Sequence, residues 1–376
     1  MRIAFLCKRR YMGKDVIDDR YGRLYEIPRQ LAMLGHDVRG FCLAYQGQAD
    51  GIWEHDALPG RLRWQSRSLG RTRLPVLLTY SHELRKALQA FAPDIVIAAS
   101  DIPHIVLGKR LANRLGVPFV ADLYDNFEGF GQARIPGMVT ALRRAVRRAD
   151  LTTTTSQPLA NYVRDHYHVR GQVVAMPSTI DKAVFHQRDK AACRAALGLP
   201  QDAVLVGTAG GLLESRGIGT LYTAWPIIAD QHDNIHLVLA GPTDGHCPPP
   251  TGMRVHYLGM LSHAHVAKLF GALDVGVIYL RDTPFGRFCF PQKAYEMMAC
   301  GLPFIATAVG VMPHLLAARR ACLYREDDVE ALVKALATCL ASPNLHANVV
   351  TDWASVIGLL EKQLIALDKP ISRDDA

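Results

Sequence analysis

The sequence predicts an α/β protein made of two facing, doubly wound, Rossmann-like domains. Three observations predict this class. Short apolar strands alternate with helical segments of roughly 10–15 residues, which is typical of parallel sheets. The pattern starts again near residue 203. The length of 376 residues suits two domains that each bury a core of their own.

In the first half, apolar runs bounded by glycine or proline are expected to form one parallel sheet. The expected strands are 2–7, 37–43, 94–99, 118–124, 151–156 and a last strand ending at 175–179. The expected helices are 24–34, 76–91, 104–115 and a basic helix that runs to Asp150. Such strand–helix–strand units are right-handed, and ligands bind where the parallel strands end.

The same order recurs after a polar, irregular stretch at 180–200, which we interpret as the linker. The expected strands are 203–210, 235–241, 255–259, 274–280 and 321–325. The expected helices are 218–230, one after Ser262, 327–340 and 352–367. We therefore expect domains at 1–179 and 180–350, and a carboxy-terminal helix within 351–376 that packs back on the first domain.

The composition is that of a globular protein, with 49% apolar and 21% charged residues. No apolar run approaches the eighteen or so residues of a membrane helix. The amino-terminal MRIAFLCKRR is expected to be a strand and not a signal peptide. None of the eight cysteines forms a C-x-x-C pair, so free buried thiols in a reducing cytoplasm are expected. His263 and His265 follow a helix start, so we expect no metal site there.

The net charge of +8 is concentrated in the first half. Residues 1–180 carry 26 lysines and arginines against 16 aspartates and glutamates. Two basic runs, 61–73 and 141–150, are interpreted by default as solvated helix faces. The functional alternative is a positive face toward anionic lipid or toward an acceptor that carries phosphate. No recognition motif for nucleic acid accompanies the charge.

A glycine-rich turn follows the first strand of the second half, in TAGGLLESRGIGTL (208–221). Gly210 and Gly211 allow a ligand to approach the backbone closely. Arg216 lies at the expected helix start, where backbone N–H groups and a guanidinium can bind a diphosphate. The alternative is a tight turn with an exposed arginine.

A second motif lies in PFGRFCFPQKAYEMMACGLPFIAT (284–307), between two apolar strands. Lys293 and Glu296 are three residues apart and share one face of a short helix that Cys300-Gly301 ends. Glu296 can accept hydrogen bonds from two ribose hydroxyls, and Lys293 can meet a phosphate or the carboxylate. The alternative is a surface ion pair, worth less than about 1 kcal/mol.

These motifs together resemble the retaining GT-B glycosyltransferases of family 4. The string P-x-K-x-x-E-x-M-A-C-G-L-P-x-I-A-T resembles the signature of that family. GGLLESRGIGTL followed by LVLAG resembles its Gly-Arg-Leu…Glu-Lys-Gly-Ile…Ala-Gly region. AMPSTID, LAMLGHDV and Trp353 are also similar, so the resemblance covers nearly the whole chain in the right order.

The resemblance implies a nucleotide-sugar donor that is held mainly by the second domain, in a GT-B architecture. Arg216 takes the position of the phosphate-binding lysine of the family, and Glu296 that of the ribose-binding glutamate. Two departures bear on the sugar. Phe288 stands where the family usually has a first glutamate, and Gly211 stands where an arginine usually follows the glycine.

The resemblance further implies that the first domain supplies the acceptor side. The polar segment 8–23 follows the first strand, where such enzymes place a glycine loop near the diphosphate. Its candidates are Gly13, Arg20 and Gly22, and the alternative is a disordered surface loop.

Three carboxylates, Asp122, Asp125 and Glu128, leave the end of a strand in ADLYDNFEGF. They are expected to orient acceptor hydroxyls or to act as a base, or alternatively to cap the next helix. His104 is interpreted as a residue of a helix start.

The expected reaction is glycosyl transfer with retention, from a nucleotide-sugar to a glycan, lipid-linked or small-molecule acceptor. No metal and no cofactor are expected, because no Asp-x-Asp occurs and the nucleotide-sugar is a co-substrate. The setting expected from the resemblance is bacterial polysaccharide or glycolipid synthesis in the cytoplasm, with peripheral contact at an anionic membrane.

Other functions remain open from the sequence. A non-catalytic nucleotide-sugar-binding subunit or a sugar-nucleotide epimerase can share the two-domain layout, as can a phosphorylase with pyridoxal phosphate. An NAD-dependent dehydrogenase is disfavoured, because no G-x-G-x-x-G follows the first strand.

Overall fold

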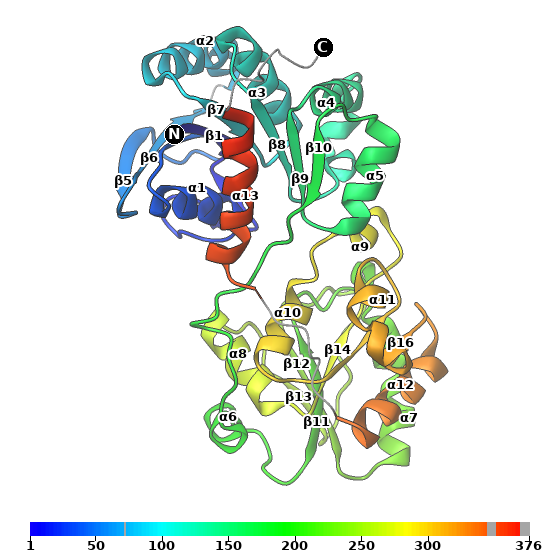
Figure 1. The fold of residues 1–376 in the computed structure, drawn as a ribbon. Helices are drawn as coiled ribbons and strands as arrows, with labels where there is room; N and C mark the ends of the chain where they lie inside the picture. The colour runs from blue at the N-terminus through cyan, green and yellow to red at the C-terminus, as the bar shows by residue number, and fades with distance from the viewer. Residues whose placement is uncertain (71–72, 344–350, 369–376) are drawn as a thin grey trace. The chain divides into compact units, whose positions relative to one another are not determined.

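The computed structural model describes residues 1–70, 73–343 and 351–368, which divide into two compact units. Unit 1 contains Met1–Ser178, Phe288–Phe290 and Trp353–Ala376, and unit 2 contains Thr179–Arg287 and Pro291–Asp352. Each unit is built on a sheet of mainly parallel strands with helices on both faces (Figure 1). The expected fold class of two doubly wound, Rossmann-like domains is confirmed.

The sheet of unit 1 has the strand order β10-β9-β8-β7-β1-β4-β6-β5. Its strands are β1 (Arg2–Lys8), β4 (Asp37–Ala44), β5 (Gly51–His55), β6 (Arg61–Ser68), β7 (Ile95–Ala98), β8 (Phe119–Leu123), β9 (Leu151–Thr154) and β10 (Gln172–Ala175). The helices are α1 (Arg23–Met33), α2 (Arg73–Phe91), α3 (Ile102–Leu115), α4 (Met138–Arg147), α5 (Gln157–Tyr167) and α13 (Trp353–Asp368), with short 3-10 turns η1 (Phe127–Gly129) and η2 (Gly131–Arg134). Only β5, at the edge, pairs antiparallel in this sheet.

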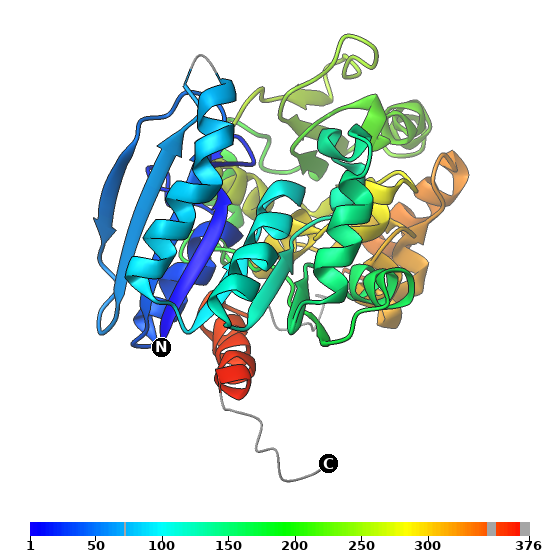
Figure 2. The same ribbon diagram turned by 90° about the horizontal axis from the view of Figure 1, so that it is seen from above.

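Two cores cover the two faces of this sheet, because side chains alternate along each strand. Ile3 and Phe5 of β1 pack in one core with α1 and α13, whereas Ala4 and Leu6 pack in the other with α2 and α3. Figures 1 and 2 show α13 beside α1, and α2 and α3 on the opposite face.

The carboxy-terminal helix α13 supplies part of the first core. Ile357 and Leu364 are fully buried in the cluster that contains β1 and α1. At the rim, His36 Nε2 lies 2.9 Å from Glu361 Oε1, which adds a polar contact between α13 and the end of α1.

The basic run at 61–73 is not a solvated helix face over its first eight residues, so that interpretation was wrong. Residues Arg61–Ser68 form strand β6, with alternating exposed and buried side chains. Leu62 and Trp64 are buried while Arg61 and Arg63 face outward. The signal was present in the sequence as a period of two, which indicates a strand with one face buried.

The sheet of unit 2 is parallel throughout, with the order β13-β12-β11-β14-β15-β16. Its strands are β11 (Val204–Ala209), β12 (Ile235–Ala240), β13 (Val255–Tyr257), β14 (Val275–Ile278), β15 (Phe304–Thr307) and β16 (Leu323–Tyr324). The remaining helices are α6 (Lys190–Leu197), α7 (Gly219–Gln231), α8 (His263–Ala272), α9 (Pro284–Phe288), α10 (Gln292–Ala299), α11 (Met312–Leu315) and α12 (Val329–Ala341), with 3-10 turns η3 (Glu214–Arg216) and η4 (Ala317–Cys322).

The stretch at 180–200 is not an irregular linker, because it contains helix α6 and belongs to unit 2. Asp189 caps the amino terminus of α6 by accepting a hydrogen bond from Ala192 N, and Gly198 ends the helix in the left-handed conformation. Arg194 is buried and its guanidinium lies 2.7 Å from Asp274 Oδ2. The capping residues were readable in the sequence, but the burial of an arginine against a partner 80 residues away was not.

All eight cysteines are free thiols, as expected from the sequence. Across the described ranges, no helix combines the length and the hydropathy needed to cross a bilayer.

Candidate functional site

The candidate site in unit 2 begins at the turn that follows β11. Gly210 has φ of 115°, a backbone conformation that favours glycine. Its N–H donates to the carbonyl of Ala240, at 2.9 Å, and Leu212 N–H donates to the carbonyl of Pro242, at 2.8 Å. The turn is thus held against the loop after β12 by main-chain hydrogen bonds.

Lys293 reaches this turn from α10, which precedes β15. Its Nζ lies 3.3 Å from the position that a Cβ on Gly210 would occupy. The same amine lies 4.5 Å from the centre of the Tyr279 ring, and the Tyr279 hydroxyl donates to the carbonyl of Gly211, at 2.9 Å. Burial raises the pKa of Tyr279, so this phenol stays protonated and remains a donor. The structure therefore brings together Gly210, Gly211 and Lys293, as the sequence predicted.

Arg216 lies at the end of η3, directly before the left-handed Gly217. The carbon of its guanidinium lies 3.9 Å from the centre of the Phe285 ring. Within residues 1–70, 73–343 and 351–368, the structure shows no hydrogen bond or ion pair of this guanidinium. Arg216 is thus a cation that an incoming anion can bind without displacing a carboxylate.

The carboxylates near Arg216 are instead paired with Arg281. Its guanidinium lies 2.5 Å from Glu214 Oε1, 3.2 Å from Glu326 and 3.0 Å from Asp327. Arg281 Nε also donates to the carbonyl of Glu214, at 2.9 Å. These contacts hold the turn that carries Arg216 through Glu214, without using the Arg216 guanidinium.

Glu296 lies one turn after Lys293 on α10 and is only 5% exposed. Its Oε1 accepts a hydrogen bond from Gln292 Nε2, at 2.8 Å, and lies 3.6 Å from His263 Nε2. A carboxylate fixed in this way is preorganised to accept hydrogen bonds from a diol. The predicted end of the helix is confirmed, because Cys300 caps it and Gly301 has φ of 73°.

The chemistry of this cluster suits a phosphate group and does not suit a metal ion. Lys293 lies at a turn whose glycines let an anion approach the backbone, and Arg216 follows in the same segment at the end of η3. Among the residues that the structure describes, no group of three or more His, Cys, Asp or Glu side chains could hold a metal.

In unit 1, the expected trio of acceptor-side carboxylates needs correction at Asp122. This carboxylate is 1% exposed and forms an ion pair with Arg23, whose side chain is fully buried. Arg23 Nε lies 3.0 Å from Asp122 Oδ2, and Thr153 Oγ1 donates to Oδ1 at 2.6 Å. Since all of these groups are buried, Asp122 joins the ends of α1, β8 and β9 and is not open to an acceptor.

Glu128 is also engaged within unit 1. Its carboxylate accepts from Arg143, at 2.7 and 3.0 Å, and from the Tyr162 hydroxyl, at 3.0 Å. Partial burial opposes ionisation, but these hydrogen bonds outweigh it and lower the pKa of Glu128. The helix-capping alternative is wrong for both residues, because Asn126 caps η1.

Asp125, like Glu128, is half-buried. It accepts a hydrogen bond from the Asn126 N–H, at 2.7 Å. Nearby, Lys8 Nζ donates to the Tyr124 hydroxyl, at 3.0 Å, and burial lowers the pKa of Lys8. Lys8 was missed in the sequence, although its place at the end of the first strand was a signal.

The segment 8–23 is ordered, so the alternative of a disordered loop is wrong. It forms a small hairpin of β2 (Arg10–Tyr11) and β3 (Lys14–Asp15), with Gly13 at its tip. Arg20 is exposed with φ of 50°, and Gly22 is the N-cap of α1. These candidates belong to unit 1, so their approach to a diphosphate in unit 2 stays a prediction.

His104 is a buried residue of a helix start, as expected. Asp101 caps α3 by accepting from His104 N–H, at 3.0 Å, and also lies 2.6 Å from His104 Nδ1.

Phe288, which stands where the family has its first glutamate, belongs to unit 1. Its ring lies 4.9 Å from that of Tyr162, and its carbonyl accepts from Ser156 Oγ at 2.8 Å. The position therefore has a packing role.

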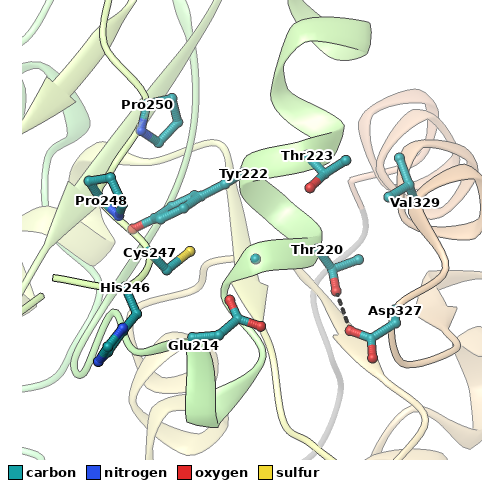
Figure 3. Close-up of a pocket in the computed structure, with 11 residues that line it drawn as sticks. Glu214, Thr220, Tyr222, Thr223, His246, Cys247, Pro248, Pro250, Asp327 and Val329 are labelled. Atoms are coloured by element: carbon teal, nitrogen blue, oxygen red, sulfur yellow. Dashed lines mark hydrogen bonds between the residues drawn. The ribbon is translucent and has the colours of Figure 1, made fainter. Parts of the chain in front are cut away.

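A separate pocket of about 660 Å³ opens beside α7 in unit 2 (Figure 3). Figure 3 shows Glu214 and Tyr222 lining it, with a hydrogen bond from Thr220 to Asp327 at one side. Burial and the neighbouring Glu214 raise the pKa of the Cys247 thiol to about 11, so this cysteine is no thiolate nucleophile. Glu214 joins the pocket to the turn of Arg216, but Gly210, Lys293 and Glu296 do not line it.

Each half of the chain matches a family of known proteins. Residues 23–184 match Glycosyltransferase Family 4, and residues 203–342 match Glycosyl transferases group 1. A D-inositol 3-phosphate glycosyltransferase of Mycobacterium tuberculosis (strain F11) is 31% identical over 302 residues, covering 77% of this chain and 53% of that protein. The enzyme of the same name from Segniliparus rotundus is 24% identical over 304 residues, covering 77% and 58%. The chain thus spans about half the length of these curated relatives.

Solved structures share the fold across the whole chain. Sucrose-phosphate synthase from Thermosynechococcus elongatus aligns with a TM-score of 0.73 at 20% identity, covering 97% of this chain and 99% of that one. Anabaena HepE in complex with UDP aligns with a TM-score of 0.66 at 17% identity, covering 98% and 97%. Residues 23–184 thus belong to Glycosyltransferase Family 4 and residues 203–342 to the group 1 glycosyl transferases, on a fold that the chain shares with GT-B structures.

Proposed function

We propose that this protein transfers a sugar from a nucleotide-sugar donor to a hydroxyl of an acceptor. The observation that carries the proposal is that Lys293 lies at the Gly210 turn and over the Tyr279 ring, while Arg216, later in the same segment as Gly210, acts electrostatically on Tyr279. These residues come from segments more than 70 positions apart, and a diphosphate is the ligand that their chemistry fits. Glu296, fixed on the same helix as Lys293, is placed to hold the ribose.

The cations have a catalytic part in this proposal as well as a binding part. When the bond between sugar and diphosphate breaks, negative charge grows on the leaving oxygen. Arg216 and Lys293 stabilise this charge, and fixed groups do so without reorganisation during the reaction. The curated relatives are named as glycosyltransferases, which supports the same reaction class for this chain.

A nucleotide panel tests the donor site. In a thermal shift assay against UDP, GDP, ADP, CMP and TDP, we expect one nucleotide to stabilise the protein selectively. Arg216→Ala should weaken its binding by roughly 10- to 100-fold, because a charge-assisted hydrogen bond is lost. Glu296→Gln should weaken nucleotide binding by about 3- to 30-fold, because the hydrogen bonds from the ribose hydroxyls lose their charged acceptor.

Arg320→Ala is the matched control, since Arg320 is an exposed arginine elsewhere in unit 2. It should bind as the wild type does. No stabilisation by any nucleotide or nucleotide-sugar would refute the transferase and favour a protein without donor binding.

We further propose that transfer retains the anomeric configuration and uses no metal and no cofactor. NMR of the product should show the donor's own anomeric configuration, and EDTA should leave the rate unchanged within about twofold. An inverted product would contradict retention, and a loss of activity restored by a divalent cation would contradict metal independence.

On the acceptor side, we propose that Asp125 orients the acceptor hydroxyl. Asp125 is partly exposed just after the end of β8, and it interacts electrostatically with Lys8, which donates to the neighbouring Tyr124 hydroxyl. Asp125→Asn should lower kcat by about 100-fold, because the acceptor hydroxyl loses the carboxylate that orients it. Asp122→Asn should instead destabilise unit 1 by about 3–5 kcal/mol, because Arg23 stays buried without its partner.

Urea unfolding and steady-state kinetics of the two variants separate these roles. An Asp122→Asn protein with wild-type stability and reduced kcat would reverse the assignment.

We propose a cytoplasmic place of action with peripheral contact to an anionic membrane, in polysaccharide or glycolipid synthesis. Support comes from α4, where Arg144 and Arg147 are exposed and the preceding Ile135 is 51% exposed. Exposed cations and an exposed apolar side chain in one segment suit an anionic bilayer surface.

Vesicle co-sedimentation tests this contact. Binding should be stronger to anionic than to neutral vesicles, and Arg144→Glu with Arg147→Glu should reduce it more than Arg320→Glu with Arg325→Glu. Equal binding to both kinds of vesicle would argue against the proposal.

A further inference from the structure

The side chain of Phe285 holds the Arg216 guanidinium in position. Phe285 lies on the short helix α9 and is 39% exposed. The guanidinium carbon of Arg216 lies 3.9 Å from the ring centre, well within the range of a cation–π contact. The ring is thus in van der Waals contact with the charged group and not merely near it.

A ring face differs from a carboxylate as a partner for arginine. It attracts the guanidinium through its quadrupole but accepts none of the five N–H donors in the usual way. A stacked arginine can therefore keep its fork of donors for a phosphate. A carboxylate in the same place would use those donors and neutralise the charge.

The neighbouring arginines show that the carboxylates of this region are used elsewhere. Arg281 takes Glu214, and Arg287 pairs with Asp282 at 2.6 and 3.0 Å. Arg216 lies among these residues and is held by the ring.

The second cation of the site also lies over an aromatic ring. Lys293 Nζ lies over the Tyr279 ring, and the Tyr279 hydroxyl fixes the carbonyl of Gly211. Both cations of the proposed diphosphate site thus rest on aromatic faces. An arginine side chain loses rotamer freedom when it binds, and holding it in place beforehand reduces that cost.

We propose that Phe285 is a positioning residue for diphosphate binding, which acts by holding the Arg216 guanidinium with its donors open. The inference rests on the proposed function, because it needs a diphosphate at this turn. Phe285 itself touches Arg216 and is not assigned a contact with the ligand.

The test compares UDP with UMP by calorimetry, or the corresponding pair for whichever base the panel selects. Phe285→Ala should weaken diphosphate binding by about 3- to 30-fold, the range of a cation–π contact. Monophosphate binding should change by less than about twofold. Phe285→Trp should restore the affinity, since indole is the strongest partner for a cation.

A double-mutant cycle shows whether Phe285 acts through Arg216. Adding Phe285→Ala to Arg216→Ala should cause no further loss. Ile227→Ala, which truncates another partly exposed apolar side chain of unit 2, should leave both affinities unchanged. If Phe285 had only a structural role, Phe285→Ala would instead weaken the binding of both nucleotides, and this loss would also appear in the Arg216→Ala background.

The outcomes separate this inference from the proposed function. Unchanged diphosphate binding in Phe285→Ala, or additive losses in the double variant, would overturn the inference and leave the donor site in place. A wild-type protein that binds no nucleotide would overturn both.

Discussion

Unit 2 depends on the close approach of two backbone turns at the ends of β11 and β12. A Cβ on Gly241 would lie 2.0 Å from the carbonyl oxygen of Gly210, so no side chain fits there. Gly241 N–H donates to the carbonyl of Gly259, and the Tyr257 hydroxyl donates to the carbonyl of Gly241. Three strand ends are therefore joined by main-chain hydrogen bonds, and Lys293 reaches a turn whose shape is already fixed.

The roles of charged residues in both units are decided by their partners across the fold. Asp122 is a buried structural anion because Arg23, 99 residues earlier, lies against it. The charge of Arg216 is not neutralised by Glu214, Glu326 or Asp327, because these carboxylates form ion pairs with Arg281. The same side-chain chemistry thus serves the scaffold in one place and the candidate site in another. What differs is whether an opposite charge lies within hydrogen-bond distance.

The sequence was sufficient for the features that depend on local pattern. Alternating strands and helices predicted both sheets, Gly301 predicted the end of α10, and the motifs placed Gly210 and Lys293 at the same edge. It was not sufficient where a contact between residues far apart in the chain determines the role of a side chain. Asp122 can be buried only because Arg23 pairs with it. Arg216 and Lys293 lie over the rings of Phe285 and Tyr279, and no spacing rule predicts these contacts from the sequence. Strand β6 was missed for another reason. Its arginines drew attention to the charge of the segment, although apolar and polar side chains alternate along it with a period of two.

Helix α13 completes the core of the unit to which the start of the chain belongs. Ile357 and Leu364 pack with Ile3 and Phe5, which leave the ribosome some 350 residues earlier. Domains generally fold as units and in the order of synthesis. Here the part of the core beside α1 that Ile357 and Leu364 fill stays uncovered until α13 has been made. The first unit can therefore complete its core only after all of unit 2 has been synthesised.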